Sequence, residues 1–198
     1  MASVRAIQVP GLGEIALGDW VDDHMWGTAQ IGTAQSADLQ VFTSGRGQQK
    51  PGTTSTNTDY DVFVPEPGRM PTGWEMLVFS IRLEVVANIN NADILNLQQT
   101  LLHEFWILSK CYSQGPMSFY PAGGGNAGAV STTANATTTA SWTNGVPAQG
   151  AAKQFLVPHK IGSGEAFFSK IRFPTAASLG STRDVRVVLA GLIKRSVQ

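Results

Sequence analysis

A chain of 198 residues has the size of one β-sandwich or β-barrel domain. Its 14 basic and 14 acidic residues cancel, which excludes an overall electrostatic attraction to nucleic acid or to an anionic membrane surface. Charged residues make up only 14% of the chain, against about 25% in an average soluble domain, so we expect neighbouring chains to cover part of the exterior.

The cysteine content and the distribution of apolar residues bear on the compartment. Cys111 is the single cysteine, which excludes an intrachain disulfide and a multi-cysteine zinc site. No positively charged segment followed by an apolar run opens the sequence, and no stretch approaches the roughly 20 apolar residues that span a bilayer. We therefore expect a protein made in a reducing cytoplasm.

Short strands separated by turn residues are predicted in the first half of the chain. Weak candidates at 38–43 and 59–64 precede the clearest strand, at 79–85, where apolar and polar residues alternate strictly. A period of two places the apolar side chains on one face of a sheet. This pattern predicts a half-buried antiparallel strand.

One helix is predicted to interrupt the strands. Residues 92–102 place Ile94, Leu97 and Leu101 at helical spacing, which gives a narrow apolar stripe. A weak strand at 105–109 follows it. We expect a short helix packed at one end of a sheet.

The segment 121–152 differs in composition from the rest of the chain. It is rich in Gly, Ala and Thr, and no charged residue occurs between Lys110 and Lys153. Because disordered loops usually carry charge, a long neutral loop that orders against another surface is expected, with Trp142 as its anchor. A solvated surface loop is the alternative.

Three strands are predicted after this loop, at 153–157, 165–173 and 184–194. The last one is almost continuously apolar and β-branched at its centre, which indicates burial on both faces and a position inside the sheet. Short strands with glycine and proline between them are typical of an all-β sandwich or barrel.

The residue patterns of catalytic and metal sites are missing. His24, His103 and His159 are widely separated, whereas metal-binding histidines are usually closely spaced. The stretch 162–164 lacks the flanking pattern of a nucleophile elbow and is interpreted as a turn. The neighbourhood 22–24 is interpreted as a solvated acidic turn. No catalytic, cofactor-binding or metal-binding residue is assigned, and no enzymatic activity is expected.

Five tryptophans are many for this length. Two or three of them are expected to fill the core. Trp20 and Trp26, in a Gly- and Asp-rich N-terminal segment, and Trp142, in the long loop, are assigned to contacts with another chain, since aromatic residues are enriched in interface cores.

Segments 56–59, 67–71, 79–85, 119–125 and 185–198 together resemble jelly-roll capsid proteins of small tailless icosahedral bacteriophages. The resemblance implies an eight-stranded antiparallel jelly-roll β-sandwich with the helix at about 92–102 and the long loop at about 121–152. It implies one domain over 1–198, with 1–36 a candidate extended N-terminal arm.

The same resemblance implies a structural virion protein that self-assembles into an icosahedral shell, as the major coat, penton or minor capsid subunit. Its partners would be copies of itself, other capsid proteins, and either the viral genome or an internal membrane on the inner face, with no cofactor and no small-molecule substrate. The alternative is a carbohydrate-binding β-sandwich module of a phage fibre or lectin type, suggested by the tryptophans. A cupin-type metal enzyme would need two or more histidines and a carboxylate around one metal.

Overall fold

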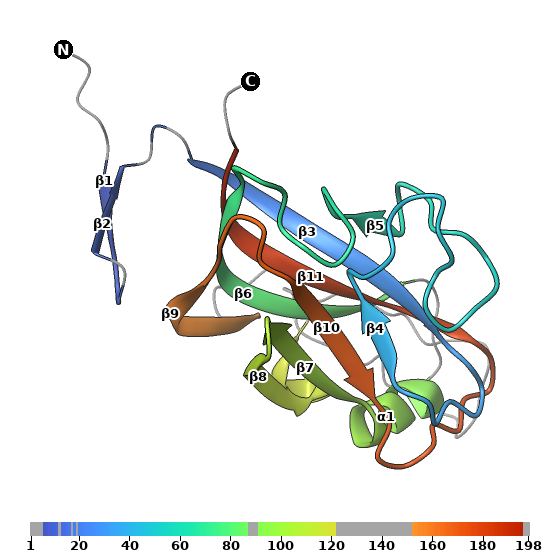
Figure 1. The fold of residues 1–198 in the computed structure, drawn as a ribbon. Coiled ribbons are helices and arrows are strands. Elements are labelled where there is room, and N and C mark those ends of the chain that lie inside the picture. Colours follow the sequence, from blue (N-terminus) through green and yellow to red (C-terminus); the bar gives the residue numbers. More distant parts are fainter. Residues whose placement is uncertain are drawn as a thin grey trace.

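The computed structural model describes residues 6–11, 13–16, 18, 20–86, 91–121 and 152–195. Within these residues, eleven strands and one α-helix are present, and the strands form three antiparallel sheets of two, four and five strands. The two larger sheets face each other as a sandwich, with helix α1 (Asn91–Thr100) at one end (Figure 1). The predicted antiparallel all-β class and the short helix are confirmed, but eleven strands replace the expected eight.

The five-stranded sheet carries the two strongest sequence patterns. From edge to edge it consists of β5 (Val62–Phe63), β3 (Trp20–Ile31), β11 (Arg183–Lys194), β6 (Glu75–Val86) and β9 (Lys153–Ile161). Alternate residues of β6 and β11, such as Ile81, Leu83 and Val187, are fully buried, as the period of two requires. Strand β11 lies between β3 and β6, so its predicted place inside the sheet is confirmed.

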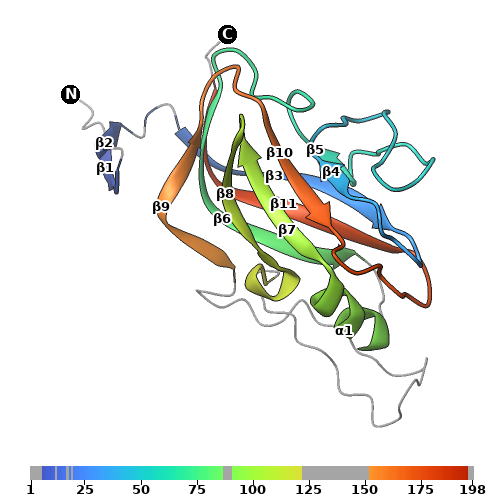
Figure 2. The same ribbon diagram turned by 60° about the horizontal axis from the view of Figure 1, so that its bottom comes forward.

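The four-stranded sheet supplies the opposite half of the core. It consists of β4 (Leu39–Val41), β10 (Phe167–Arg172), β7 (Leu102–Ile107) and β8 (Lys110–Pro116), in that order. Phe105, Phe167 and Ile171 point into one hydrophobic cluster shared with the five-stranded sheet, and Leu97 of α1 joins it. A 3₁₀ turn, η2 (Met117–Phe119), follows β8 next to α1, and Figure 2 shows this end of the sandwich.

Strand β3 corrects one sequence interpretation. Residues 22–24, expected to form an acidic turn, lie within this twelve-residue strand, which pairs with β11 along its whole length. Consecutive charged residues and Gly27 concealed the strand pattern. Gly27 is required because a Cβ there would lie 2.4 Å from the Val41 side chain of the opposite sheet.

The long connection between β4 and β6 is held against the outer side of β3 by buried polar contacts. Lys50 Nζ lies 2.6 Å from Asp61 Oδ1 and 3.2 Å from Asp184 Oδ2, and the Lys50 side chain is 9% exposed. Thr28 Oγ1 donates a hydrogen bond to the Asp61 carbonyl at 2.7 Å. At Gly52, a Cβ would lie 1.9 Å from the Gln30 carbonyl oxygen, so the loop backbone touches the strand directly.

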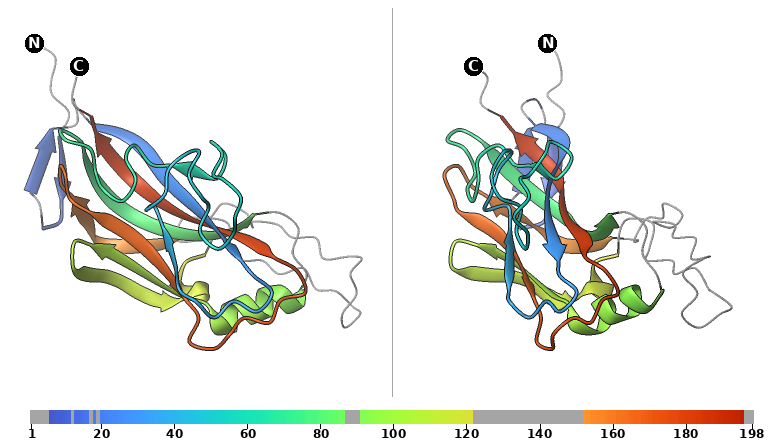
Figure 3. Two further views of the ribbon diagram at one scale, coloured as in Figure 1. Left: turned by 45° about the vertical axis from the view of Figure 1, so that its right-hand side comes forward. Right: turned by 90° about the vertical axis from the view of Figure 1, so that its right-hand side faces the viewer.

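A separate hairpin precedes the sandwich. Strands β1 (Ala6–Val9) and β2 (Gly13–Ala16) pair only with each other. The hairpin lies beyond the end of the sandwich at which β3 begins and β11 ends (Figures 1 and 3). Of the candidate arm at 1–36, it is this hairpin that lies outside the sandwich, because β3 already belongs to the large sheet.

The loop at 121–152 and Trp142 lie outside the described residues, apart from positions 121 and 152. Within the described part of the chain, no helix has the length and apolar character needed to cross a membrane.

Candidate interaction face

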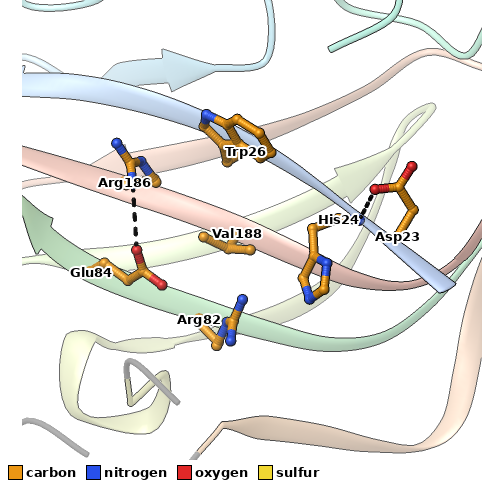
Figure 4. A pocket seen from close by; sticks show the side chains of 7 residues that line it. All are labelled: Asp23, His24, Trp26, Arg82, Glu84, Arg186 and Val188. Carbon is orange, nitrogen blue, oxygen red and sulfur yellow. Dashed lines mark hydrogen bonds and ion pairs between the residues drawn. The ribbon is translucent and has the colours of Figure 1, made fainter. Parts of the chain in front are cut away.

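A shallow pocket of about 330 Å³ opens on the outer face of the five-stranded sheet. Strands β3, β11 and β6 contribute its lining, and Figure 4 shows the side chains from close by. The lining residues are Asp23, His24, Trp26, Arg82, Glu84, Arg186 and Val188.

The strand register explains why these residues meet. Val188 on the central strand pairs with Trp26 on one side and with Arg82 on the other. Because side chains at paired positions share a face, the three lie side by side, with Val188 as an apolar floor that is 4% exposed. Arg186 and Glu84 pair one step further along the same face.

Aromatic groups border the pocket next to β3. The Trp26 ring stacks on Phe63 with centroids 4.9 Å apart, and its Nε1 donates a hydrogen bond to the Tyr60 carbonyl at 3.2 Å. Arg186 donates to the same carbonyl at 2.9 Å and lies 4.4 Å from the centre of the Tyr60 ring. Tyr60 is nevertheless 66% exposed. Exposed tyrosine, tryptophan and arginine are the residue types enriched in protein interfaces.

Arg82 is the exceptional residue of the pocket. Its Nε is buried and has no acceptor, and it makes no hydrogen bond, ion pair or ring contact with any described residue. The other charged residues of the pocket each have an ion-pair partner: Asp23 pairs with Arg195, and Glu84 lies 3.8 Å from Arg186. The Arg186 Nε is also buried without an acceptor, but its Nη2 donates to the Tyr60 carbonyl. A partly buried guanidinium without an acceptor is unfavourable in the isolated chain.

The residues predicted as chain contacts are only partly brought together. Trp20 and Trp26 are both half-buried and point to the same face of β3, since their positions differ by an even number. Trp26 lines the pocket and Trp20 does not. Whether either contacts another chain stays a prediction.

The expectation that two or three tryptophans fill the core is not met by the described ones. Trp74 packs against the core but is only partly buried. Trp106 is half-buried on the outer face of the four-stranded sheet, where it stacks on Phe168 at 6.1 Å and donates to Glu104 at 2.9 Å. The core is instead formed mainly by Phe, Leu, Ile, Val and Met side chains.

Three further titratable groups, His103, Cys111 and Glu104, lie in or near the core outside the pocket. His103 is fully buried between the sheets, both its ring nitrogens lack a partner, and burial lowers its pKa to about 3. Burial, followed by the charge of Glu104, raises the pKa of the Cys111 thiol, which disfavours the reactive thiolate. Glu104 accepts a hydrogen bond from Arg172 at 2.8 Å. Among the described residues, no group of three or more His, Cys, Asp or Glu side chains is placed to hold a metal.

Sequence reasoning did not identify Arg82, Arg186 or Tyr60 as members of a shared site. The alternation in β6 does place Arg82 on the face opposite the core. What the sequence does not show is that β11 lies between β3 and β6, which are remote from it in the chain.

Comparisons with models of protein families, with curated proteins and with solved structures found no significant match to this chain.

Proposed function

We propose that this protein is a jelly-roll subunit of a tailless icosahedral phage capsid, which self-assembles through contacts between copies. The observation that carries the proposal is the order in which the sandwich strands pair. A jelly roll arises when a chain forms one long antiparallel hairpin that wraps around into two facing sheets.

Four nested strand pairs support this topology. Taken in chain order, the eight strands of the sandwich are β3, β4, β6, β7, β8, β9, β10 and β11. The first pairs with the last, the second with the seventh, the third with the sixth and the fourth with the fifth. This nesting is what a wrapped hairpin produces.

The three other strands fit as additions to this arrangement. The short strand β5 lies in the connection between β4 and β6 and extends one edge by two residues. Strands β1 and β2 form the hairpin that precedes the sandwich. These three strands do not alter the nested pairing of the eight sandwich strands.

Surface chemistry favours a subunit that is covered by neighbours. Charge is sparse over the whole chain, and the outer face of the large sheet presents Trp26, Tyr60, Phe63 and an arginine without an acceptor. Leu156 of the edge strand β9 is 96% exposed. Apolar groups that are exposed in one copy are typical of permanent assemblies. The role is that of a major coat, penton or minor capsid subunit.

The proposal is tested by expressing the full chain alone. Sedimentation velocity over a range of protein concentration, pH and salt is combined with negative-stain microscopy. Trimers, pentameric rings or closed shells are expected. A monodisperse monomer at high concentration under all of these conditions would contradict the proposal.

A carbohydrate-binding module is the second candidate, favoured by one observation. The Trp26 ring borders a pocket that also contains Asp23 and Glu84, and carboxylates beside an aromatic ring suit hydroxyl-rich ligands. Saturable binding to a glycan array that is lost in Trp26→Ala and retained in Trp106→Ala would favour this candidate. If the protein binds no glycan on the array, the carbohydrate-binding function is excluded.

A further inference from the structure

Charge pairing is nearly complete in the described part of the chain. Ion pairs or hydrogen bonds engage almost every described carboxylate, from the exposed Arg46–Asp59 pair to the buried Lys50–Asp61 pair. Glu14 and Asp22 are the described carboxylates for which no such partner exists. Few described carboxylates are therefore free to pair with another chain.

Arg82 stands out among the cations in the same position. Four described cations have no ion-pair partner: Arg82, Lys110, Lys153 and Lys194. The Lys110 ammonium lies 4.9 Å from the centre of the Tyr112 ring, and lysine in general ends in a compact, well-hydrated ammonium group that tolerates solvent. The buried Nε of Arg82 is removed from water and lacks an acceptor. A planar guanidinium in this state is suited to a carboxylate, which can accept two of its hydrogen bonds.

Glu14 lies on the hairpin, which shares no strand pairing with the sandwich although Val9 of its first strand is only 3% exposed. It is exposed on β2 of the hairpin, and an isolated two-stranded hairpin is only marginally stable in water. The contact of the hairpin with its own sandwich is at the tip, where a Cβ at Gly11 would lie 3.0 Å from the Val157 side chain. The two strands of the hairpin lie beyond the end of β3 (Figure 1). The Arg82 pocket is formed by β3, β11 and β6 (Figure 4).

We infer that the Arg82 pocket receives Glu14 from the β1–β2 hairpin of a second copy of this chain. The inference rests on the proposed self-assembly and names the contact that drives it. The hairpin of one copy covers the outer sheet face of the next, so the contact is head-to-tail. Such heterologous contacts close into rings when the rotation between copies allows it.

The charge of the pocket argues against a polyanion as its occupant. Glu84 and Asp23 line the same pocket as Arg82 and Arg186, so a chain of phosphates would meet two carboxylates. A single carboxylate beside aromatic side chains fits better, because it needs only the one guanidinium that is free. The chain supplies such a group in Glu14.

Charge reversal tests the pairing in the full-length protein. Arg82→Glu and Glu14→Arg are prepared singly and together, with Lys153→Glu as the matched control at another cation without a partner. Each single reversal is expected to lower the assembled fraction in sedimentation velocity at least about tenfold. The double variant is expected to recover the wild-type fraction to within about twofold, and Lys153→Glu is expected to match wild type.

Glu14→Gln keeps the test independent of folding, since the hairpin shares no strand pairing with the sandwich. It is expected to weaken assembly while the thermal transition of the sandwich is unchanged. Single variants that assemble like wild type, or a double variant that stays unassembled, overturn the inference and leave the proposed function in place. A wild-type monomer overturns both.

A nucleic-acid binding experiment tests the other candidate ligand of the pocket, a phosphate chain. Wild-type protein is titrated with a fluorescent single-stranded oligothymidylate at low salt. No binding is expected. Binding that is lost in Arg82→Glu would identify the pocket as a phosphate site and overturn the inference.

Discussion

At the scale of single residues, His103 is the side chain least suited to its surroundings. It lies at a core position of β7, its ring packs edge-on against Tyr120 with centroids 4.6 Å apart, and neither ring nitrogen has a partner. Burial therefore lowers its pKa from 6.5 to about 3 in the folded protein. The neutral imidazole behaves there as a small aromatic group.

This gives a prediction for stability against pH. The unfolded chain binds a proton near pH 6.5 and the folded chain does not until about pH 3, so the stability contributed by neutral His103 is complete above 6.5 and is lost as the pH falls. Between pH 7.5 and 4.5 the expected loss is about 3 kcal/mol. Urea denaturation at several pH values measures it, and His103→Leu should remove most of this slope. An unchanged slope in the variant would contradict the prediction.

Gly191 illustrates a residue fixed by backbone contact. It lies on β11 opposite the bulge in β6 between Val78 and Ser80, where a Cβ would lie 1.8 Å from the Leu77 carbonyl oxygen. A backbone oxygen in a central strand cannot move aside. Gly191→Ala is expected to lower the free energy of unfolding by at least about 3 kcal/mol.

Chemical denaturation checks this value, with Gly18→Ala as the control. A Cβ at Gly18 has no heavy atom within 4 Å, so that variant should remain within about 0.5 kcal/mol of wild type. Equal stability of the two variants would show that the bulge tolerates the extra carbon.

At the scale of elements, the connection between β4 and β6 is held by an ion triad in which Lys50 is buried between Asp61 and the partly exposed Asp184. Burial opposes the charge on Lys50, but the hydrogen bonds and charges of Asp61 and Asp184 raise its pKa. Burial likewise opposes the charge of Asp61, whose pKa is lowered by hydrogen bonds from Lys50 and Thr58. Lys50 and Asp61 therefore stay charged at neutral pH, and the contact of Lys50 with Asp184 joins the loop to the first residues of β11.

Removing the cation from this triad should be costly. Lys50→Met leaves the nearly buried Asp61 and the partly exposed Asp184 without their shared counter-charge, and a loss of about 3 kcal/mol in the free energy of unfolding is expected. Arg46→Met is the matched control in the same loop, because Arg46 and Asp59 are 75% and 70% exposed and such pairs contribute less than about 1 kcal/mol. Thermal denaturation of both variants measures the difference. Similar losses would mean that burial does not set the strength of these pairs.

The elements also show what the sequence could and could not predict. Strict alternation at 79–85 and the apolar run at 184–194 led to β6 and β11, since both patterns follow directly from burial of one or both sheet faces. The helix was predicted within two residues at each end. Strand β3 was missed because Asp22, Asp23 and Gly27 interrupt its pattern, and only pairing with β11 makes those residues compatible with a strand.

The sequence also did not predict strand β8 or the pocket around Arg82. Strand β8 contains Gly115 and ends at Pro116, so residues 114–116 were interpreted as a turn, although β8 pairs with the whole of β7. Trp26 was chosen for its residue type alone. Its partners Arg82 and Val188 come from strands that are distant in sequence, and no local pattern contains that information.

At the scale of the whole molecule, the ends of the chain are not equivalent. Strand β11 lies between β3 and β6 and pairs with both over nearly their full length. The hairpin of β1 and β2 shares no strand pairing with the sandwich. The C-terminal strand therefore completes the core, whereas the N-terminal hairpin is available for contacts elsewhere.

Two truncations separate these roles. A chain ending at residue 182 loses the central strand of the large sheet, and it is expected to show no cooperative unfolding transition by circular dichroism. A chain lacking residues 1–18 keeps every strand of the sandwich, so its melting temperature should stay within about 4 °C of wild type, which corresponds to a change of about 1 kcal/mol or less. Its assembly should nevertheless be lost, because the hairpin carries Glu14. An N-terminal truncation that assembles normally would assign the contacts between copies to other surfaces, such as the exposed Leu156 of β9.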